Sequence, residues 1–300
     1  ALLPIINAQA DTNPNVVIIY IDDMGIGDIG CYGGKFVATP NIDKLAQDGL
    51  LFNQYYSSAP VSSPSRCGLT TGLFPIEVGI NTFLNDKASN KRCEQRNYLD
   101  DKLPSMARAF QNAGYATGAF GKWGLGSPGS VGDPNRQGID EFFGFNCQLL
   151  AHNYYADHLW HNQERVELPG NNDGGFGVYT QDTIHQMALR FIDENQDKPF
   201  FLFLPYVIPH AELIVPEDSI IQKFRGLYPE TPYKGCDEGC AAFRKGGYCS
   251  QTEPHATFAA MIYRLDVYVG QVVDKLKELG LYEHTCLLYT SPSPRDSTSS

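Results

Sequence analysis

The sequence predicts an α/β fold in which a mostly parallel sheet is flanked by helices. Residues 16–21 form a continuous apolar run, which is typical of a strand buried on both faces of a parallel sheet. Segments with strand character then alternate with segments of helical periodicity. The chain has 300 residues, 42% of them hydrophobic, and can therefore bury a large core. Neither a repeat nor a linker indicates a second domain.

The expected elements follow one another, each with its own local signal. The strand at 16–21 ends on Asp22 and Asp23, and Thr39 precedes a helix that Pro40 begins and Gly49 ends. Alternation predicts a strand, and repeated apolar residues at helical spacing predict a helix. These patterns predict a strand over 51–56, a helix over 103–113, a strand over 116–120, a helix over 180–191, a strand over 199–207 and a helix over 254–279.

The composition excludes some classes of partner. A formal net charge of −11 argues against nucleic acid and anionic membrane surfaces. An anionic substrate then needs a local positive site, which Arg66 and Lys122 can provide. After the N-terminus, the chain has no run near the roughly 20 apolar residues of a membrane span. Three cysteines (Cys236, Cys240 and Cys249) lie in a Gly-rich insertion, where a disulfide or free thiols fit better than zinc, because the C-x-x-C repeat and nearby His ligands are missing.

Both ends of the chain differ from an ordinary domain sequence. Residues 1–10 are apolar and close on an A-x-A site, which is typical of a signal peptide remnant cleaved after Ala10. Residues 286–296 are the translation of DNA that resembles a sequencing-library adapter, and 297–300 are low-complexity. We therefore expect 11–285 to be an incomplete domain and 286–300 to be an artefact. Residues 286–291 are nevertheless apolar enough to imitate a strand.

The segment from Ser62 to Arg66 is a candidate reactive loop. Ser62 or Ser63 can cap a helix, Pro64 suits its first turn, and the free N–H groups there can face an anion. Arg66 adds a fixed positive fork nearby. A simple Ser-Pro helix start is the alternative, since short motifs have a real false-positive rate.

Polar residues also follow three of the expected strands. Asp22 and Asp23 close the first, Lys122 follows the strand at 116–120, and His210 follows the strand ending near 207. In open α/β sheets, ligands bind at the carboxyl ends of the strands, so these side chains are expected to converge. An Asp-Asp pair alone is usually a solvated turn, but after a buried strand it favours a metal role.

With these motifs in order, the chain resembles the serine type of the sulfatase family, within the alkaline phosphatase superfamily. The motifs are S-x-P-S-R at 62–66 with L-x-T-G at 69–72, the opening at 15–33, T-P-N-x-D at 39–43, G-K-W at 121–123 and the helix at 256–280. The resemblance implies a sulfate ester hydrolase in which Ser62 is oxidised to formylglycine, whose hydrated aldehyde attacks sulfur.

The resemblance also implies roles for individual residues. Asp22, Asp23 and the oxidised Ser62 would bind Ca²⁺, because oxygen ligands suit a hard cation. Arg66 and Lys122 would orient the formylglycine and counter the charge on the sulfate oxygens. His210 would protonate the leaving alcohol. Since a lone His after a strand is more often structural, the role of His210 rests mainly on the resemblance.

Two positions depart from the family pattern. Gly124 replaces the His of G-K-W-H-L-G, and His152 is the nearest substitute base, with His158 and plain surface roles left open. Pro292 and Ser293 stand where the family has a metal-binding Asp and Asn. We therefore expect the polypeptide as written to be inactive, with Asp22 and Asp23 left as a like-charge pair that raises a carboxyl pKa.

The sequence thus predicts an exported, calcium-dependent sulfatase that hydrolyses aryl or glycan sulfates. The alternatives are a phosphomonoester or phosphonate hydrolase with unmodified Ser62, and an inactive sulfate- or glycan-binding homologue. A serine at the modified position implies a radical-type, oxygen-independent maturing enzyme as partner. It also implies a periplasmic, cell-surface or extracellular location in an anaerobic or facultative bacterium. The sulfated substrate itself is not revealed, because selectivity lies in loops.

Overall fold

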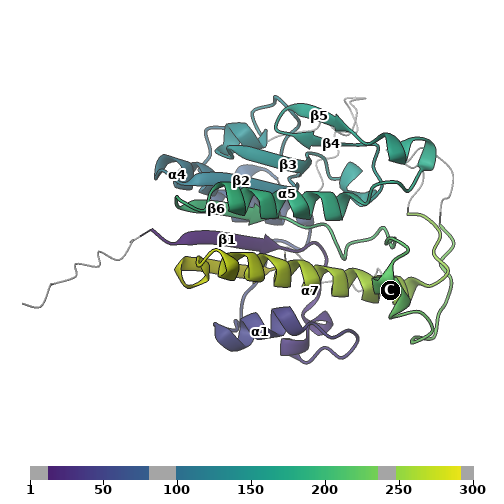
Figure 1. Ribbon diagram of the computed structural model, residues 1–300. Coiled ribbons are helices and arrows are strands. Elements are labelled where there is room, and N and C mark those ends of the chain that lie inside the picture. The colour runs from purple at the N-terminus through teal and green to yellow at the C-terminus, as the bar shows by residue number, and fades with distance from the viewer. Residues whose placement is uncertain (1–12, 81–98, 236–247, 292–300) are drawn as a thin grey trace, which may run out of the picture.

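The computed structural model describes residues 13–80, 99–235 and 248–291, and these build a seven-stranded sheet with helices on both faces (Figure 1). The strands are β1 (Asn15–Tyr20), β2 (Ala116–Lys122), β3 (Glu141–Phe145), β4 (His158–His161), β5 (Glu164–Glu167), β6 (Phe200–Leu204) and β7 (Thr285–Thr290). The helices are α1 (Pro40–Asp48), α2 (Ser62–Thr71), α3 (Pro75–Val78), α4 (Met106–Asn112), α5 (Thr180–Glu194), α6 (Ser219–Gln222) and α7 (Pro254–Glu278).

The sheet has the order β5-β4-β3-β2-β6-β1-β7 and is mostly parallel, as predicted. Neighbouring strands pair in parallel along the series β3-β2-β6-β1-β7. At the other edge, β4 and β5 form a hairpin, and β4 pairs with β3 in antiparallel. The sequence did not predict β3, β4 or β5. In the parallel part, the carboxyl ends of β1, β2, β3 and β6 meet at a single edge of the sheet, which is where ligands bind in folds of this kind.

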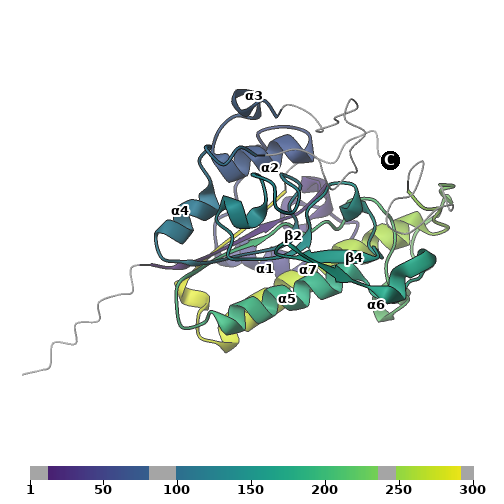
Figure 2. The ribbon, with the colours of Figure 1, turned by 90° about the horizontal axis from the view of Figure 1, so that it is seen from above.

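The alternation of side chains explains why both sheet faces are covered. In β1, Val17 and Ile19 belong to one buried cluster, and Ile18 and Tyr20 belong to another on the opposite face. The first cluster also takes in apolar residues of α1, α5 and α7, and the second takes in residues of α2 and α4. Figure 2 shows the corresponding layers, with α2 and α4 on one side of the sheet and α5 and α7 on the other.

The long helices begin and end close to their expected positions. α1 and α7 both begin at a proline and end one or two residues before a glycine, and Gly280 adopts φ +70°. α4 begins later than expected, at Met106, because the Ser105 hydroxyl accepts a hydrogen bond from the Arg108 amide and caps the helix. Among the described helices, none is long and apolar enough to cross a membrane.

The predicted strand at 51–56 is wrong. These residues form no strand, and Phe52 and Tyr56 are 56% and 78% exposed. Apolar alternation produces a strand only where a neighbouring strand supplies hydrogen bonds and one face is covered. The Phe52 carbonyl instead accepts a hydrogen bond from the Tyr32 hydroxyl at 2.9 Å.

At the end of the described chain, β7 pairs with β1 in parallel, from Asn15 opposite Thr285 to Tyr20 opposite Thr290. The apolar segment expected to imitate a strand therefore does take a place in the sheet. The adapter origin of 286–300 stays a prediction. The pairing of β7 with β1 shows that the segment can occupy this edge of the sheet, and it says nothing about the origin of the sequence. Residues 1–10 and two of the clustered cysteines, Cys236 and Cys240, lie outside the described residues.

His185 in α5 is expected to make stability fall in mild acid. It is fully buried against the Tyr268 ring, its Nδ1 lies 2.7 Å from the Tyr206 hydroxyl, and its Nε2 lies 2.7 Å from the Gln271 carboxamide oxygen. Burial lowers the pKa of His185 to about 4, although the contact with Gln271 opposes this. The unfolded chain, with a His pKa of about 6.5, therefore binds the proton first as pH falls.

The free energy of unfolding should then drop by about 3 kcal/mol between roughly pH 6.5 and pH 4. Below about pH 4, His185 should cause no further loss of stability, because it is protonated in both the folded and the unfolded protein. Urea unfolding of the wild type and of His185→Gln across this range measures the effect. The His185→Gln variant should show a shallower pH dependence. Identical slopes for the two proteins would contradict the assignment to His185.

Candidate active site

Asp22 and Lys122 form the centre of the candidate site. The parallel sheet positions both residues. Asp22 lies two residues after the end of β1, and β2 ends on Lys122. Both side chains are fully buried, and Lys122 Nζ donates to Asp22 Oδ2 at 2.5 Å. Arg66 Nη2 lies 3.5 Å from the same carboxylate oxygen. Two cations therefore face one buried carboxylate.

This arrangement decides the protonation of Asp22. Burial by itself raises the pKa of the carboxyl, but the charges of Lys122 and Arg66 outweigh it and hold the pKa well below its usual range. The sequence analysis expected the Asp22–Asp23 pair to raise a carboxyl pKa. For Asp22 that expectation is wrong, because Lys122 and Arg66 lie beside it and lower its pKa. Burial lowers the pKa of Lys122, and its pairing with Asp22 opposes that shift.

Helix α2 brings Ser62 and Arg66 to the same edge. The two residues lie four positions apart and so share one face of the helix, where Arg66 Nε donates to Ser62 Oγ at 2.9 Å. Arg66 Nη1 donates to the Lys122 carbonyl at 2.5 Å, and this bond ties α2 to β2. The N-cap is Val61 with no side-chain cap, so the expected capping by Ser62 or Ser63 is wrong. Ser62 instead occupies the first turn, with its hydroxyl held by Arg66.

Asp23 and His210 form a second contact next to this cluster. His210 Nε2 lies 3.1 Å from Asp23 Oδ2, and the Tyr154 hydroxyl donates to the His210 carbonyl. The backbone of Asp23 adopts φ +55°, an uncommon conformation for a residue other than glycine. This turn lets consecutive carboxylates serve one site, with Asp22 facing Lys122 and Asp23 facing His210.

His152 lies against His210. The two rings stack with centroids 4.2 Å apart, and Tyr248 contacts both. Burial lowers the pKa of His152 well below its usual value, and the charge of Lys122 lowers it further. Both effects favour the neutral form of His152, and its Nε2 has no hydrogen-bond partner in the described structure. His158 lies in β4, with Nδ1 2.6 Å from Asp157 Oδ1.

The donor set at this edge fits a hard cation. Asp22 Oδ1 is buried and has no hydrogen-bond partner within the described ranges, and Asp23 and Ser62 add further oxygens. The described residues contain no group of three His, Cys, Asp or Glu side chains able to hold a metal. Asp22, Asp23 and Ser62 thus offer two carboxylates and one hydroxyl, which are the oxygen ligands that a hard cation takes.

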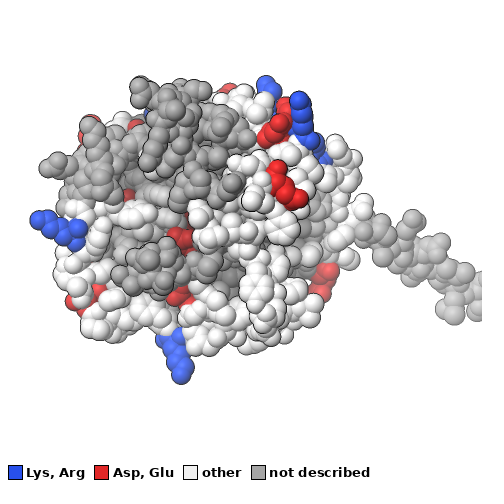
Figure 3. All heavy atoms as spheres, turned by 180° about the vertical axis from the view of Figure 1, so that it is seen from behind, with Lys and Arg blue, Asp and Glu red and all other residues white. Residues whose placement is uncertain are grey.

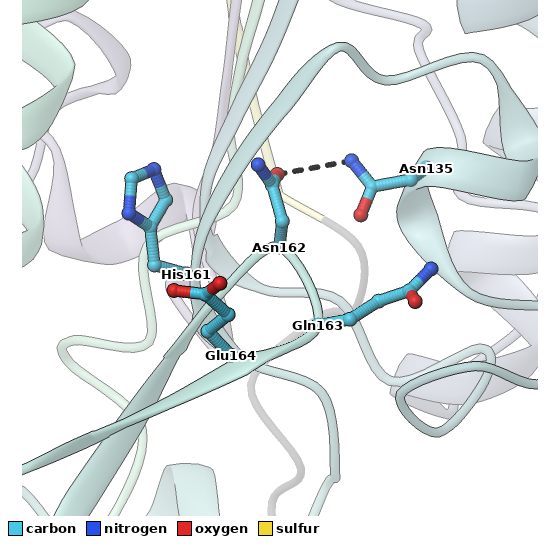
Figure 4. Close-up of a pocket in the computed structure, with 5 residues that line it drawn as sticks. All are labelled: Asn135, His161, Asn162, Gln163 and Glu164. Carbon is cyan, nitrogen blue, oxygen red and sulfur yellow. Dashed lines mark hydrogen bonds between the residues drawn. The ribbon is translucent and has the colours of Figure 1, made fainter.

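On the face seen in Figure 3, the Lys and Arg side chains lie near the outline, and the acidic side chains lie both in the middle and near the outline. A pocket at the β4–β5 hairpin is lined by Asn135, His161, Asn162, Gln163 and Glu164, where Asn135 donates to Asn162 (Figure 4). It contains none of the predicted site residues.

Sequence reasoning missed several residues that the fold brings to the site. Tyr248 contacts both histidine rings, and the Tyr154 hydroxyl donates to the His210 carbonyl. Asn146 and Gln148 follow β3 beside Gly124. Because the sequence analysis did not predict β3, it could not place residues 146–148 at the carboxyl edge of the sheet.

The fold and this edge cluster define an α/β protein with a buried, charged site at the carboxyl edge of its parallel sheet. A family model described as Sulfatase matches residues 14–291, and the chain belongs to the sulfatase family. It is 30% identical over 297 residues to the N-acetylgalactosamine-6-sulfatase of Canis lupus familiaris, covering 95% of this chain and 51% of the relative. It is 38% identical over 341 residues to the N-acetylgalactosamine-6-O-sulfatase of Bacteroides thetaiotaomicron, covering 95% and 60%.

A solved structure supports the same fold. Ps i-CgsB in complex with k-i-k-neocarrahexaose superposes with a TM-score of 0.74 at 28% identity, covering 93% of this chain and 58% of that one. The chain therefore spans between about half and two thirds of the length of these relatives.

Proposed function

We propose that the protein is an exported, calcium-dependent sulfatase that hydrolyses glycan or aryl sulfate esters through a formylglycine derived from Ser62. The observation that supports this most is the contact of Ser62 Oγ with Arg66, in a cluster that also contains Lys122 and Asp22. An unassisted serine hydroxyl is a weak nucleophile. Family membership and this cationic setting favour the modified residue.

Each side chain then has a distinct task. Arg66 orients residue 62, and Arg66 with Lys122 counters the charge that develops on the sulfate oxygens. His210, held by Asp23 and Tyr154, donates a proton to the leaving alcohol. Asp22, Asp23 and residue 62 would hold Ca²⁺, which when bound supplies positive charge to the reacting oxygens. We further propose His152, with its unpaired Nε2, as the substitute base in a chain with Gly124.

The names of the relatives indicate the first substrates to try. Two of them are N-acetylgalactosamine 6-sulfatases, and a structural relative is bound to a carrageenan-type oligosaccharide. We therefore propose a sulfated glycan over a simple aryl ester. Release of sulfate from N-acetylgalactosamine 6-sulfate and from p-nitrophenyl sulfate measures the preference.

Mass spectrometry of the peptide containing Ser62 tests the mechanism. Protein made in its native host, or with a radical-type maturing enzyme, should show a residue two hydrogens lighter than serine. Protein made without that enzyme should keep serine and release no sulfate. Full sulfatase activity with unmodified Ser62 would reject the mechanism. Hydrolysis of phosphonate or phosphate monoesters by that protein would support the alternative hydrolase, and sulfated-sugar binding without turnover would support a binding homologue.

A further inference from the structure

Two carboxamide side chains near the site have no partners. The amide nitrogen and oxygen of Asn146 and those of Gln148 are all buried, and none has a hydrogen bond within the described structure. Leaving a buried polar group unpaired costs about 1–3 kcal/mol, so folded proteins pair nearly all of them. Four unpaired atoms on two side chains, two positions apart along the chain, therefore point to a group outside the described residues that pairs with them.

The backbone places these residues at the carboxyl edge of the sheet. The Trp123 amide donates to the Phe145 carbonyl at 2.8 Å, and the Gly124 amide donates to the Asn146 carbonyl at 3.1 Å. Further along the same segment, His152 stacks on His210. Residues 146–152 thus run from beside Lys122 to the histidine pair.

The absence of a side chain at Gly124 leaves space for the side chain of Gln148. It adopts φ +73°, which favours glycine, and a Cβ at this position would lie 2.3 Å from Gln148 Nε2. The Gln148 side chain therefore occupies the space of a residue-124 side chain. Gln148 as a whole is half-buried and its neighbour Leu149 is exposed, so this end of the segment reaches the surface, whereas Asn146 is 2% exposed and lies deeper.

We propose that Asn146 and Gln148 form a subsite for the hydroxyl groups of the sugar that bears the sulfate. Each carboxamide offers both donors and an acceptor. A sulfate group has only acceptors, and the buried cations Lys122 and Arg66 already match it. A sugar hydroxyl both donates and accepts, so it satisfies both ends of an amide. This inference rests on the proposed sulfatase function and assigns that function to carbohydrate substrates.

The test uses a protein that spans the full length of the relatives and compares one sugar and one aryl substrate. Gln148→Leu and Asn146→Leu remove the amides at similar volume, and Gln163→Leu makes the same change on the exposed β4–β5 hairpin (Figure 4). For each Asn146 and Gln148 variant, KM for N-acetylgalactosamine 6-sulfate should rise about tenfold, the loss expected for hydrogen bonds to a hydroxyl. Rates with p-nitrophenyl sulfate, which has no sugar hydroxyl, should stay within about twofold of the wild type. Gln163→Leu should change neither substrate.

The other outcomes are also informative. Equal losses on both substrates would show that the amides contact the sulfate or the reacting residue, and unchanged kinetics would show that only water occupies the subsite; either result overturns the proposal. Thermal unfolding of each variant separates lost hydrogen bonding from a folding defect.

A binding measurement separates this inference from the proposed function. Calorimetry of N-acetylgalactosamine 6-sulfate binding to Ser62→Ala, with and without Gln148→Leu, needs no turnover. About tenfold weaker binding with Gln148→Leu supports the subsite even if the wild type hydrolyses neither substrate. Equal binding rejects the subsite even if sulfate is released.

Discussion

Replacing Asp22 with alanine is expected to lower the free energy of unfolding by about 3–5 kcal/mol. The carboxylate is fully buried and faces Lys122 at 2.5 Å and Arg66 at 3.5 Å. Without it, Lys122 and Arg66 lose the buried carboxylate that both face, and neither side chain is exposed to water. Urea unfolding at neutral pH measures the loss.

Two controls separate this effect from a general cost of removing a carboxylate. Asp48→Ala removes the partner of Lys44, a surface ion pair at 2.6 Å, and should cost no more than about 0.5 kcal/mol. Lys122→Met combined with Asp22→Ala should recover part of the stability, because it removes one of the unpaired charges. A cost for Asp22→Ala as small as that of Asp48→Ala would mean that the cations are screened, and the buried cluster would not be as described.

In a protein that spans the full length of the relatives, Arg66→Lys is expected to reduce kcat/KM for sulfate release by about 10²–10³-fold. The guanidinium contacts Ser62 Oγ through Nε, the Lys122 carbonyl through Nη1 and the Asp22 carboxylate through Nη2. A lysine keeps one charge but cannot direct donors to three groups at once. Residue 62 and Lys122 would then lose their common anchor.

Arg108→Lys is the matched control for this substitution. Arg108 also donates to backbone carbonyls, those of Asp101, Leu103 and Arg136, but it lies in α4 and contacts no predicted site residue. It should leave sulfate release unchanged. The formylglycine content of each variant is measured by mass spectrometry, so that a failure of maturation is not counted as a failure of catalysis. Wild-type kcat/KM in fully modified Arg66→Lys protein would remove Arg66 from the proposed machinery.

The parts of the fold predicted from sequence are those with strong local signals. Continuous apolar runs predicted β1 and β6, and long helical periodicity with a Pro start and a Gly end predicted α1 and α7. β4 and β5 are four residues each, with mixed polarity, and they form a hairpin on β3. Such short edge strands depend on their neighbours. The alternating segment at 51–56 failed for the same reason, since no strand lies beside it.

The composition of the site was predictable because its residues follow strands and motifs. Asp22, Lys122 and His210 come after three strands whose carboxyl ends meet in a parallel sheet. Ser62 and Arg66 share a helix face through their spacing alone. The structure brings these residues together, and the roles assigned to them stay proposals for the experiments above.

The sequence by itself determined the fold class, the family and the residue types at the carboxyl edge, because these depend on local patterns and on their order along the chain. Only the tertiary structure decided how those residues act on one another. The direction of the Asp22 pKa depends on Lys122, 100 positions away, and the place of Gln148 depends on the space left by Gly124. Electrostatic and steric interactions depend on the distance between groups in space, and both are stronger in the buried interior. The spacing of residues along the chain therefore does not reveal them.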